Sequence, residues 1–452
     1  MYSIVDLHDD VLIHLFSLIP VSDILTVRQT CRRFSCLTKL RIIWCNKFCT
    51  EVLSKKLPIP GSLCPFDKIT GEDLEWRTKR ALRLERQWHT SSTVGASVSL
   101  ALPKKDVKKV LLLPGGNEAL TVHPDFVQLW QRDATTLELA MKPTASWIFA
   151  EQDSTVVRDS ACSDRIAVAS YNGTRSAVEV LDVTPQQPFA KRCSYATLPG
   201  RLVGMHENFL VLDATEIAED DEKAEKALIL VDYNSSTQSY ATLQQLPFYG
   251  NYLSHTMFAD HLVVIWEHFL STYRLPHSPS DCSGILDPSH IFRLRNRVQL
   301  PVAFTPCQAT YHLPGTEESK DEPQFLTIYS KPAERIWGMS GSVLRTVLYV
   351  ADKASGEFGL AGIPTSVQEE CEAISMGPSG RGVWVEHGNV HQCIPRSVYS
   401  FNGPIPTADF EDFRKPLCHI PVHSDDLCVD FDDGMGRLAV ASGGEVKIID
   451  FV

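Results

Sequence analysis

After Thr90 the chain repeats one pattern for about 360 residues. Short runs rich in β-branched and aromatic residues alternate with turns made of Gly, Pro, Asn, Asp and Ser. The clearest unit is 427–452, where two strand-like runs meet at a turn over 432–434 and a third run follows Gly443-Gly444. A repeated unit of this kind buries its apolar faces only by stacking against its neighbours, so the repetition constrains the fold more than any other feature.

The spacing of these units predicts a ring of small sheets. The units end near Trp130, Leu181, Asp232, Tyr273, Tyr349, Tyr399 and Ile449. Most of them are about 50 residues apart, and four short strands in about 40 to 50 residues are typical of one blade of a β-propeller. We therefore expect seven blades, or eight if the long interval before Tyr349, which contains LPGTEESKDEP, holds another.

The last unit offers a way to close the ring. It contains only three strand-like runs before Val452, whereas residues 92–102 alternate like a strand and have no partner of their own. We expect this early strand to complete the last blade, because pairing the two ends of the domain removes exposed sheet edges.

Residues 1–90 have a helical pattern instead. Apolar residues recur at helical spacing from Val11 to Ile19, and Pro20 ends the run. Ser22 and Asp23 suit the N-cap of a second helix, and Thr30 suits the start of a third. From these patterns we predict a small helical module at residues 1–60, a helical linker at 61–90 and the propeller at 91–452.

The linker contains GEDLEWRTKRALRLERQWH, residues 71–89. Its apolar residues share one helix face, which predicts that the helix packs against the domain that follows. The same helix carries five cations, Arg77, Lys79, Arg80, Arg83 and Arg86. Four acidic residues nearly cancel them, so we interpret the polar side as a solvated face rather than a nucleic-acid surface.

Composition excludes several classes of protein. The net charge of −12 argues against nucleic-acid binding as the main activity, because such binding needs clustered Lys and Arg. Thirteen cysteines without a CxxC pair suggest reduced thiols in a cytoplasmic or nuclear protein. Asp6, Asp9 and Asp10 stand where a signal peptide would be basic, and no apolar run reaches membrane-spanning length.

Motifs for catalysis or cofactor binding are weak throughout. GMGRLA at 434–439 fits a relaxed dinucleotide fingerprint, but only β-patterned residues follow it, so a hairpin turn is the better interpretation. His387, His391 and Cys393 would diverge on a hairpin instead of converging on a metal. We interpret His255, His261 and His268 as buried or turn histidines that hydrogen-bond to the backbone, and not as metal ligands. We therefore predict no metal, no cofactor and no enzymatic activity.

The opening segment HDDVLIHLFSLIPVSDILTVRQTCRRF carries more specific information. An amphipathic helix does not require Pro20, Asp23 or the run Cys31-Arg32-Arg33-Phe34 at these positions. Trp44 follows the segment ten residues later. In these positions residues 7–34 resemble an F-box, with His8 where the family has Pro and with one residue more around Ile19-Pro20. The remainder is similar to the divergent WD-repeat-like propellers of fungal F-box proteins.

The resemblance implies a function in ubiquitin conjugation. An F-box docks on the Skp-family adaptor of an SCF-type, cullin-RING ubiquitin ligase, and the propeller binds a protein substrate. The implied adaptor-binding residues are Leu7, His8, Val11, Leu12, Leu15, Phe16, Pro20, Leu25 and Val27. Residues 1–60 carry a charge of +3 while the remainder carries −15, which suits an acidic adaptor. Two alternatives are a scaffold outside any ligase and a propeller enzyme with a central-channel site.

Overall fold

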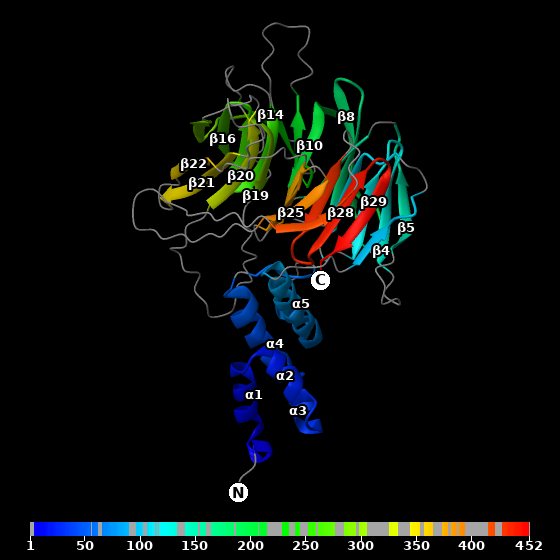
Figure 1. Ribbon diagram of the computed structural model, residues 1–452. Helices are drawn as coiled ribbons and strands as arrows, with labels where there is room; N and C mark the ends of the chain where they lie inside the picture. Colours follow the sequence, from blue (N-terminus) through cyan, green and yellow to red (C-terminus); the bar gives the residue numbers. More distant parts are fainter. Residues whose placement is uncertain are drawn as a thin grey trace.

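The computed structural model places a helical stalk beneath a ring of sheets, with the N-terminus at the far end of the stalk (Figure 1). The structure describes residues 4–55, 57–61, 66–89, 96–102, 106–113, 115, 117–132, 141–151, 154–159, 164–184, 187–206, 208–214, 228–234, 240–244, 252–258, 261–275, 284–294, 298–304, 325–332, 344–352, 357–364, 373–377, 381–386, 388–393, 415–420 and 427–451.

The stalk consists of short helices followed by one long helix. Its elements are η1 (Ile4–Asp6), α1 (Asp9–Leu18), α2 (Val21–Arg28), α3 (Arg32–Leu37), α4 (Arg41–Lys47), the π-helix η2 (Phe48–Leu53), η3 (Phe66–Lys68) and α5 (Gly71–His89).

The turns between the first helices follow from their sequences. Pro20 is the N-cap of α2, so the predicted cap at Ser22 and Asp23 is wrong, and both residues lie in the first turn. Proline suits this position because it fixes φ and has no N–H to leave unpaired. Helix α3 begins at Arg32 and not at Thr30, because the Cys31 sulfur accepts a hydrogen bond from the backbone N–H of Phe34 at 3.5 Å.

The strands of the described residues form seven sheets. They are β2 (Lys109–Leu112), β3 (Glu118–Val122), β4 (Phe126–Arg132) and β5 (Met141–Ile148) in the first; β6 (Thr155–Arg158), β7 (Arg165–Tyr171), β8 (Arg175–Asp182) and β9 (Ala190–Pro199) in the second; β10 (Arg201–His206), β11 (Phe209–Asp213), β12 (Leu228–Asp232), β13 (Tyr240–Leu243) and β17 (Gly284–Leu286) in the third; β14 (Tyr252–Phe258), β15 (His261–Trp266), β16 (Phe269–Arg274) and β18 (His290–Arg293) in the fourth; β19 (Val298–Phe304), β20 (Phe325–Pro332), β21 (Leu344–Asp352) and β22 (Glu357–Pro364) in the fifth; β23 (Ala373–Met376), β24 (Gly382–Glu386), β25 (Asn389–Cys393) and β26 (Lys415–His419) in the sixth; and β1 (Ala96–Ser99), β27 (Cys428–Asp432), β28 (Arg437–Ser442) and β29 (Glu445–Asp450) in the seventh.

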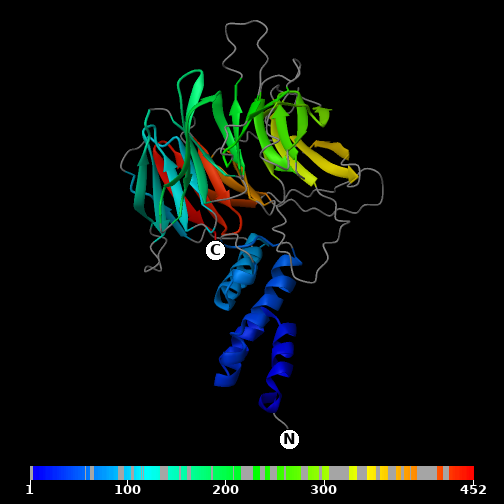
Figure 2. The same cartoon turned by 180° about the vertical axis from the view of Figure 1, so that it is seen from behind.

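Six of these sheets are four-stranded and antiparallel, and together the sheets make the β-propeller that the repeat pattern predicts (Figure 1 and Figure 2). The third sheet differs, because β17, which follows β16 in the sequence, pairs parallel to β13 as a fifth strand. The eighth-blade alternative depended on the insertion before Tyr349, and residues 305–324 of that insertion lie outside the described residues.

The first and last strands of the propeller pair with each other. Strand β1 is antiparallel to β29, with Val98 opposite Ile448, and the backbone N–H of Leu100 extends the ladder to the carbonyl of Val446 at 2.9 Å. This pairing confirms the prediction that the early strand completes the last sheet. Buried residues of β2 and β4 then pack against those of β28 and β29, which joins the first sheet to the seventh.

Candidate docking module and its attachment to the propeller

The implied adaptor-binding residues fall into two groups by burial. Leu12 and Phe16 are buried in the core of the helical module, where the Phe16 ring meets the edge of Phe34 with centroids 5.5 Å apart. Leu15, Leu25 and Val27 are half-buried, and the last two pack against the same core. Leu12, Phe16, Leu25 and Val27 therefore help to hold the module together.

The second group faces solvent. Val11 is 46% exposed and Leu7 is 37% exposed, and the side chains of His8 and Pro20 are exposed as well. Three further apolar residues that the sequence interpretation omitted are also exposed, namely Ile4, Val5 and Leu18. We call Ile4, Val5, Leu7 and Val11 the N-terminal apolar patch. These four residues are close together in the sequence, and apolar residues that form one exposed patch mark interaction sites.

Arg33 fixes the backbone beneath this patch. Its guanidinium donates to the backbone carbonyls of Val5 and Leu7 and, through Nε at 3.0 Å, to the Asp9 carboxylate. The contacts join α3 to the turn that precedes α1. Arg33 of the Cys31–Phe34 run therefore has a structural role, because it holds the backbone of the exposed Val5 and Leu7.

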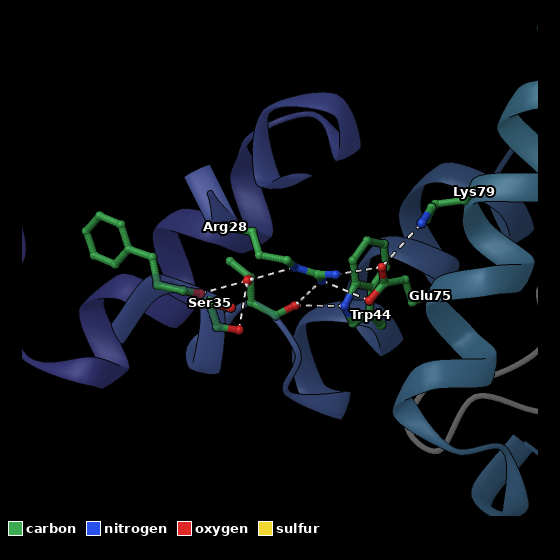
Figure 3. A network of polar contacts seen from close by, with 7 residues as sticks. Arg28, Ser35, Trp44, Glu75 and Lys79 are labelled. Carbon is green, nitrogen blue, oxygen red and sulfur yellow. Dashed lines mark hydrogen bonds and ion pairs between the residues drawn. The ribbon is translucent and has the colours of Figure 1, made fainter. Parts of the chain in front are cut away.

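A polar network connects the helical module to α5 (Figure 3). The Arg28 guanidinium donates to both oxygens of the Glu75 carboxylate at 2.8 Å and to the carbonyl of Thr38 at 3.0 Å. It also lies 5.7 Å from the ring centroid of Trp44, whose indole N–H donates to the same carbonyl at 2.8 Å. A two-bond Arg–carboxylate pair specifies orientation as well as distance, so this network sets the position of α5 against the module.

Helix α5 belongs to two cores. Leu74 and Ala81 lie in the core of the helical module, whereas Leu84 and Trp88 lie in a cluster with the sixth and seventh sheets. The Trp88 ring meets Phe431 at 5.9 Å in an edge-on contact. The prediction that this helix packs against the domain that follows is therefore confirmed.

Buried ion pairs join the same helix to the propeller. Arg80 donates to the carbonyl of Met435 at 2.6 Å and to the Asp450 carboxylate at 3.0 Å. Arg437 donates to the other oxygen of Asp450 at 3.0 Å, and Arg381 pairs with Glu85. Asp450 and Arg437 are buried, and buried charges need their partners, so the Arg80 pair resists separation of α5 from the sheets.

The candidate chemical motifs do not assemble into a metal site among the described residues. The run 434–439 forms the turn and first residues of the β27–β28 hairpin, as predicted. His255 accepts or donates a 2.6 Å hydrogen bond with the Tyr252 hydroxyl, and burial lowers the pKa of His255 to about 4. His391 stacks on Trp384, and His387 lies outside the described residues. Over the described ranges there is no group of three or more His, Cys, Asp or Glu suited to a metal ion.

No helix in the described part of the chain combines the length and the apolar composition that a membrane span requires.

Comparison with known proteins gives one family match. Residues 4–46 match the family model described as the F-box domain. No curated protein matches the chain significantly. Among solved structures, the chain is similar to the WD40 domain of SCAP from fission yeast, with 10% identity, 76% of this chain and 82% of that chain covered, and a TM-score of 0.42. It is also similar to the RRP9 WD40 repeats, with 9% identity, coverages of 80% and 99%, and a TM-score of 0.44.

The sheet topology identifies the propeller. The family match and the burial pattern identify the helical module. The chain carries an F-box domain at residues 4–46, which α5 attaches to a β-propeller.

Proposed function

We propose that this protein is the substrate-recognition subunit of an SCF-type ubiquitin ligase. In this role the F-box domain docks on a Skp-family adaptor and the propeller binds a protein substrate for ubiquitination. An F-box domain joined to a propeller supports an adaptor or scaffold role in general. The proposal also implies that the protein works in the cytoplasm or nucleus and catalyses no reaction itself.

The single observation that carries the proposal is the N-terminal apolar patch on a matched F-box. Ile4, Val5, Leu7 and Val11 are all more than one-third exposed, on a module whose core contains the buried Leu12, Phe16 and Ile24. Burying apolar area contributes about 25 cal/mol per Å² of favourable free energy, so covering this patch stabilises the complex with the partner. We propose that the adaptor is that partner.

We further propose that only the exposed members of the implied residues contact the adaptor, and the burial pattern supports this division. Leu12 and Phe16 contribute by holding the module together, because both are almost fully buried within it. Leu7 and Val11 are the members that a partner can reach without unfolding the module. His8 is exposed at the N-cap of α1, and Pro20 is exposed at the N-cap of α2. We propose that both contact the adaptor at the edge of the interface.

The test is capture of the purified adaptor by the full chain. Leu7→Asp with Val11→Asp should abolish capture and change the melting temperature little, because both side chains are partly exposed and neither lies in the module's core. The matched control is Ile148→Asp, which changes an exposed apolar residue of β5, 78% exposed, outside the helical module. Full capture by the Leu7/Val11 double variant would overturn the docking assignment.

A second measurement separates a ligase subunit from a scaffold. The adaptor-bound chain, reconstituted with the cullin, RING and conjugating components, should transfer ubiquitin to a protein that co-purifies through the propeller. Transfer that disappears with the Leu7/Val11 variant supports the ligase role. Adaptor capture without any transfer to a co-purifying protein supports the scaffold role instead.

A further inference from the structure

We propose that Lys109 and Arg158 form a binding site for a carboxylate group at the inner edge of the propeller. We call it the inner carboxylate site. It lies where the first strands of three neighbouring sheets meet, namely β27 of the seventh sheet, β2 of the first and β6 of the second. It is distinct from the N-terminal apolar patch and does not depend on adaptor binding.

Contacts between the sheets place these three strands next to one another. The Asp430 carboxylate of β27 accepts a 2.6 Å hydrogen bond from the backbone N–H of Leu112 in β2. The Arg158 guanidinium of β6 donates to the carbonyl of the same Leu112. The Lys109 ammonium of β2 contacts the carbonyl of Val156 in β6 at 3.5 Å. Each strand is the end strand of its own sheet, so these contacts between end strands mark the inside of the ring.

Two cations share one carboxylate at this site. Asp430 pairs with Arg158 at 3.1 Å. Asp432, the next carboxylate on β27, interacts more strongly with Arg437 than with Arg158 and does not contribute to the electrostatics of Lys109. Among the described residues no carboxylate pairs with the Lys109 ammonium, whose only hydrogen bond there is its 3.5 Å contact. A cation withdrawn from water needs an anionic partner, so the charge balance of the site lacks one negative charge.

The environment of Lys109 agrees with this balance. Burial is the main cause that lowers the pKa of Lys109; Cys428 and Asp430 act to raise it, and Arg158 lowers it. Burial also raises the pKa of the Cys428 thiol, so this neighbour is uncharged at neutral pH. The ammonium is therefore desolvated more than it is compensated, and a bound anion would restore the charged form.

Both donors are within reach of solvent. Lys109 is half-buried, and the Arg158 side chain is 32% exposed. One terminal nitrogen of Arg158 is committed to Asp430 and to the carbonyl of Leu112, whereas its other two nitrogens donate to no described residue. A carboxylate has one negative charge and two accepting oxygens, so it can accept from the ammonium and the guanidinium together.

The carboxylate can belong to a small acid or to an acidic side chain of a protein held by the propeller. Thermal unfolding of the full chain measures binding, because a ligand of the folded state raises the melting temperature. The probes are acetate and the blocked tripeptide acetyl-Gly-Glu-Gly-amide, and sodium chloride keeps the ionic strength equal. The uncharged comparison is acetyl-Gly-Gln-Gly-amide, and inorganic phosphate is the comparison for a second kind of anion.

We expect both carboxylate probes to raise the melting temperature and the glutamine peptide to leave it unchanged. A larger rise with the glutamate peptide than with acetate would assign the site to a polypeptide side chain. An equal or smaller rise would assign it to a small acid. Either result supports a carboxylate site, because both probes offer the same group.

Two variants identify the site. Lys109→Met should abolish the rise, because it removes the ammonium and keeps an unbranched side chain of similar length. The matched control is Lys447→Met, since Lys447 is a half-buried lysine of β29 whose charge already pairs with Glu445 at 3.8 Å. This control should keep the full response to acetate.

A measurement on the unmodified chain guards against a folding defect in the variants. Acetate should raise the pKa of Lys109, followed by carbon-13 NMR after reductive methylation of the lysines, because an anion favours the charged ammonium. Three results would overturn the proposal. They are no response of the unmodified chain to either carboxylate probe, an unchanged response in Lys109→Met, and a larger response to phosphate than to acetate, which would assign the site to phosphate.

Discussion

His8 stands where the F-box pattern has proline, yet its backbone already follows the path of a proline. Its φ of −62° and ψ of 148° are close to those of Pro20, −56° and 154°, and each residue is the N-cap of the helix that follows. The His8 ring contributes only an exposed contact with Asp10 at 3.3 Å. The departure from the family pattern is therefore a change of side chain and not of backbone path.

We expect His8→Pro to stabilise the helical module by about 0.4–1 kcal/mol, because proline removes unfolded conformations without disturbing the native φ. Urea unfolding followed by far-UV circular dichroism measures the change. The control His14→Pro, inside α1, should cost about 3 kcal/mol or more, because it removes a helical hydrogen bond. A loss of stability in His8→Pro would show that the histidine side chain or its N–H contributes to the fold.

Asp432 makes the stability of the propeller depend on pH. Its carboxylate accepts from the backbone N–H of Met435 at 3.0 Å, and burial followed by the charge of Asp433 raises the pKa of Asp432 to about 6. Between the unfolded value of 3.8 and about 6, the folded state therefore binds more protons than the unfolded state. Stability then falls as the pH rises through this window and levels off above it.

Asp432→Asn should remove this loss, because the amide keeps the acceptor for Met435 and carries no charge. The variant should match the unmodified chain near pH 4 and exceed it by up to about 3 kcal/mol at pH 7. Denaturant unfolding across this pH range measures the difference. A constant difference between the two proteins would mean that Asp432 titrates normally in the fold.

At the scale of elements, α5 acts as a bridge because its charged residues are divided between two domains. Arg28 of α2 and Glu75 of α5 are 47 positions apart in the sequence, and Arg80 and Asp450 are 370 apart. Neither pair follows from helical spacing. The apolar stripe of α5 predicted that it would pack against a domain, but the contacts show that it packs against both.

Arg28→Ala should destabilise the helical module by about 2 kcal/mol, because it leaves the partly buried Glu75 carboxylate without its two strong hydrogen bonds. Lys79→Ala is the control, and it should change stability by less than about 0.5 kcal/mol, because the Lys79 ammonium is largely in solvent. Thermal unfolding of the full chain, followed by far-UV circular dichroism, compares the two. Equal effects would mean that the network adds little beyond surface charge.

At the scale of the whole molecule, the pairing of β1 with β29 joins the two ends of the propeller. The bond from Leu100 to Val446 places Val98 and Ile448 in a hydrogen-bonded pair of the same ladder, two residues along. Ser99 lies opposite Lys447 in a pair of the other kind, so its N–H points away from β29.

Val98→Pro should therefore lower the unfolding temperature of the propeller by several degrees, because it removes a ladder bond at the closure. Ser99→Pro is the matched control and should change it little, since a proline is tolerated where the N–H faces away from the sheet. Differential scanning calorimetry measures both. Equal shifts would indicate that the pairing at the closure contributes little to the cooperativity of the ring.

Local periodicity along the chain is enough to predict several features of this protein. A two-residue period broken by turns predicted the repeated sheets, an unpaired early strand predicted the closure at β29, and the order Pro20, Asp23 and Cys31 to Phe34 predicted the F-box that residues 4–46 match. These are patterns over a few residues, and backbone geometry translates them directly into strands, helices and turns.

Only the tertiary structure decided how those elements meet. It assigned Leu12 to the core and Val11 to the exposed surface within one apolar run, and it added β17 to a sheet of the preceding unit. It also paired Glu75 and Glu85 of α5 with arginines far away in the sequence. A helical period shows that one face is apolar but not what covers it, and charge counted along the sequence ignores partners brought close by folding. Burial and charge pairing depend on packing between segments far apart in the chain, so they are properties of the assembled fold.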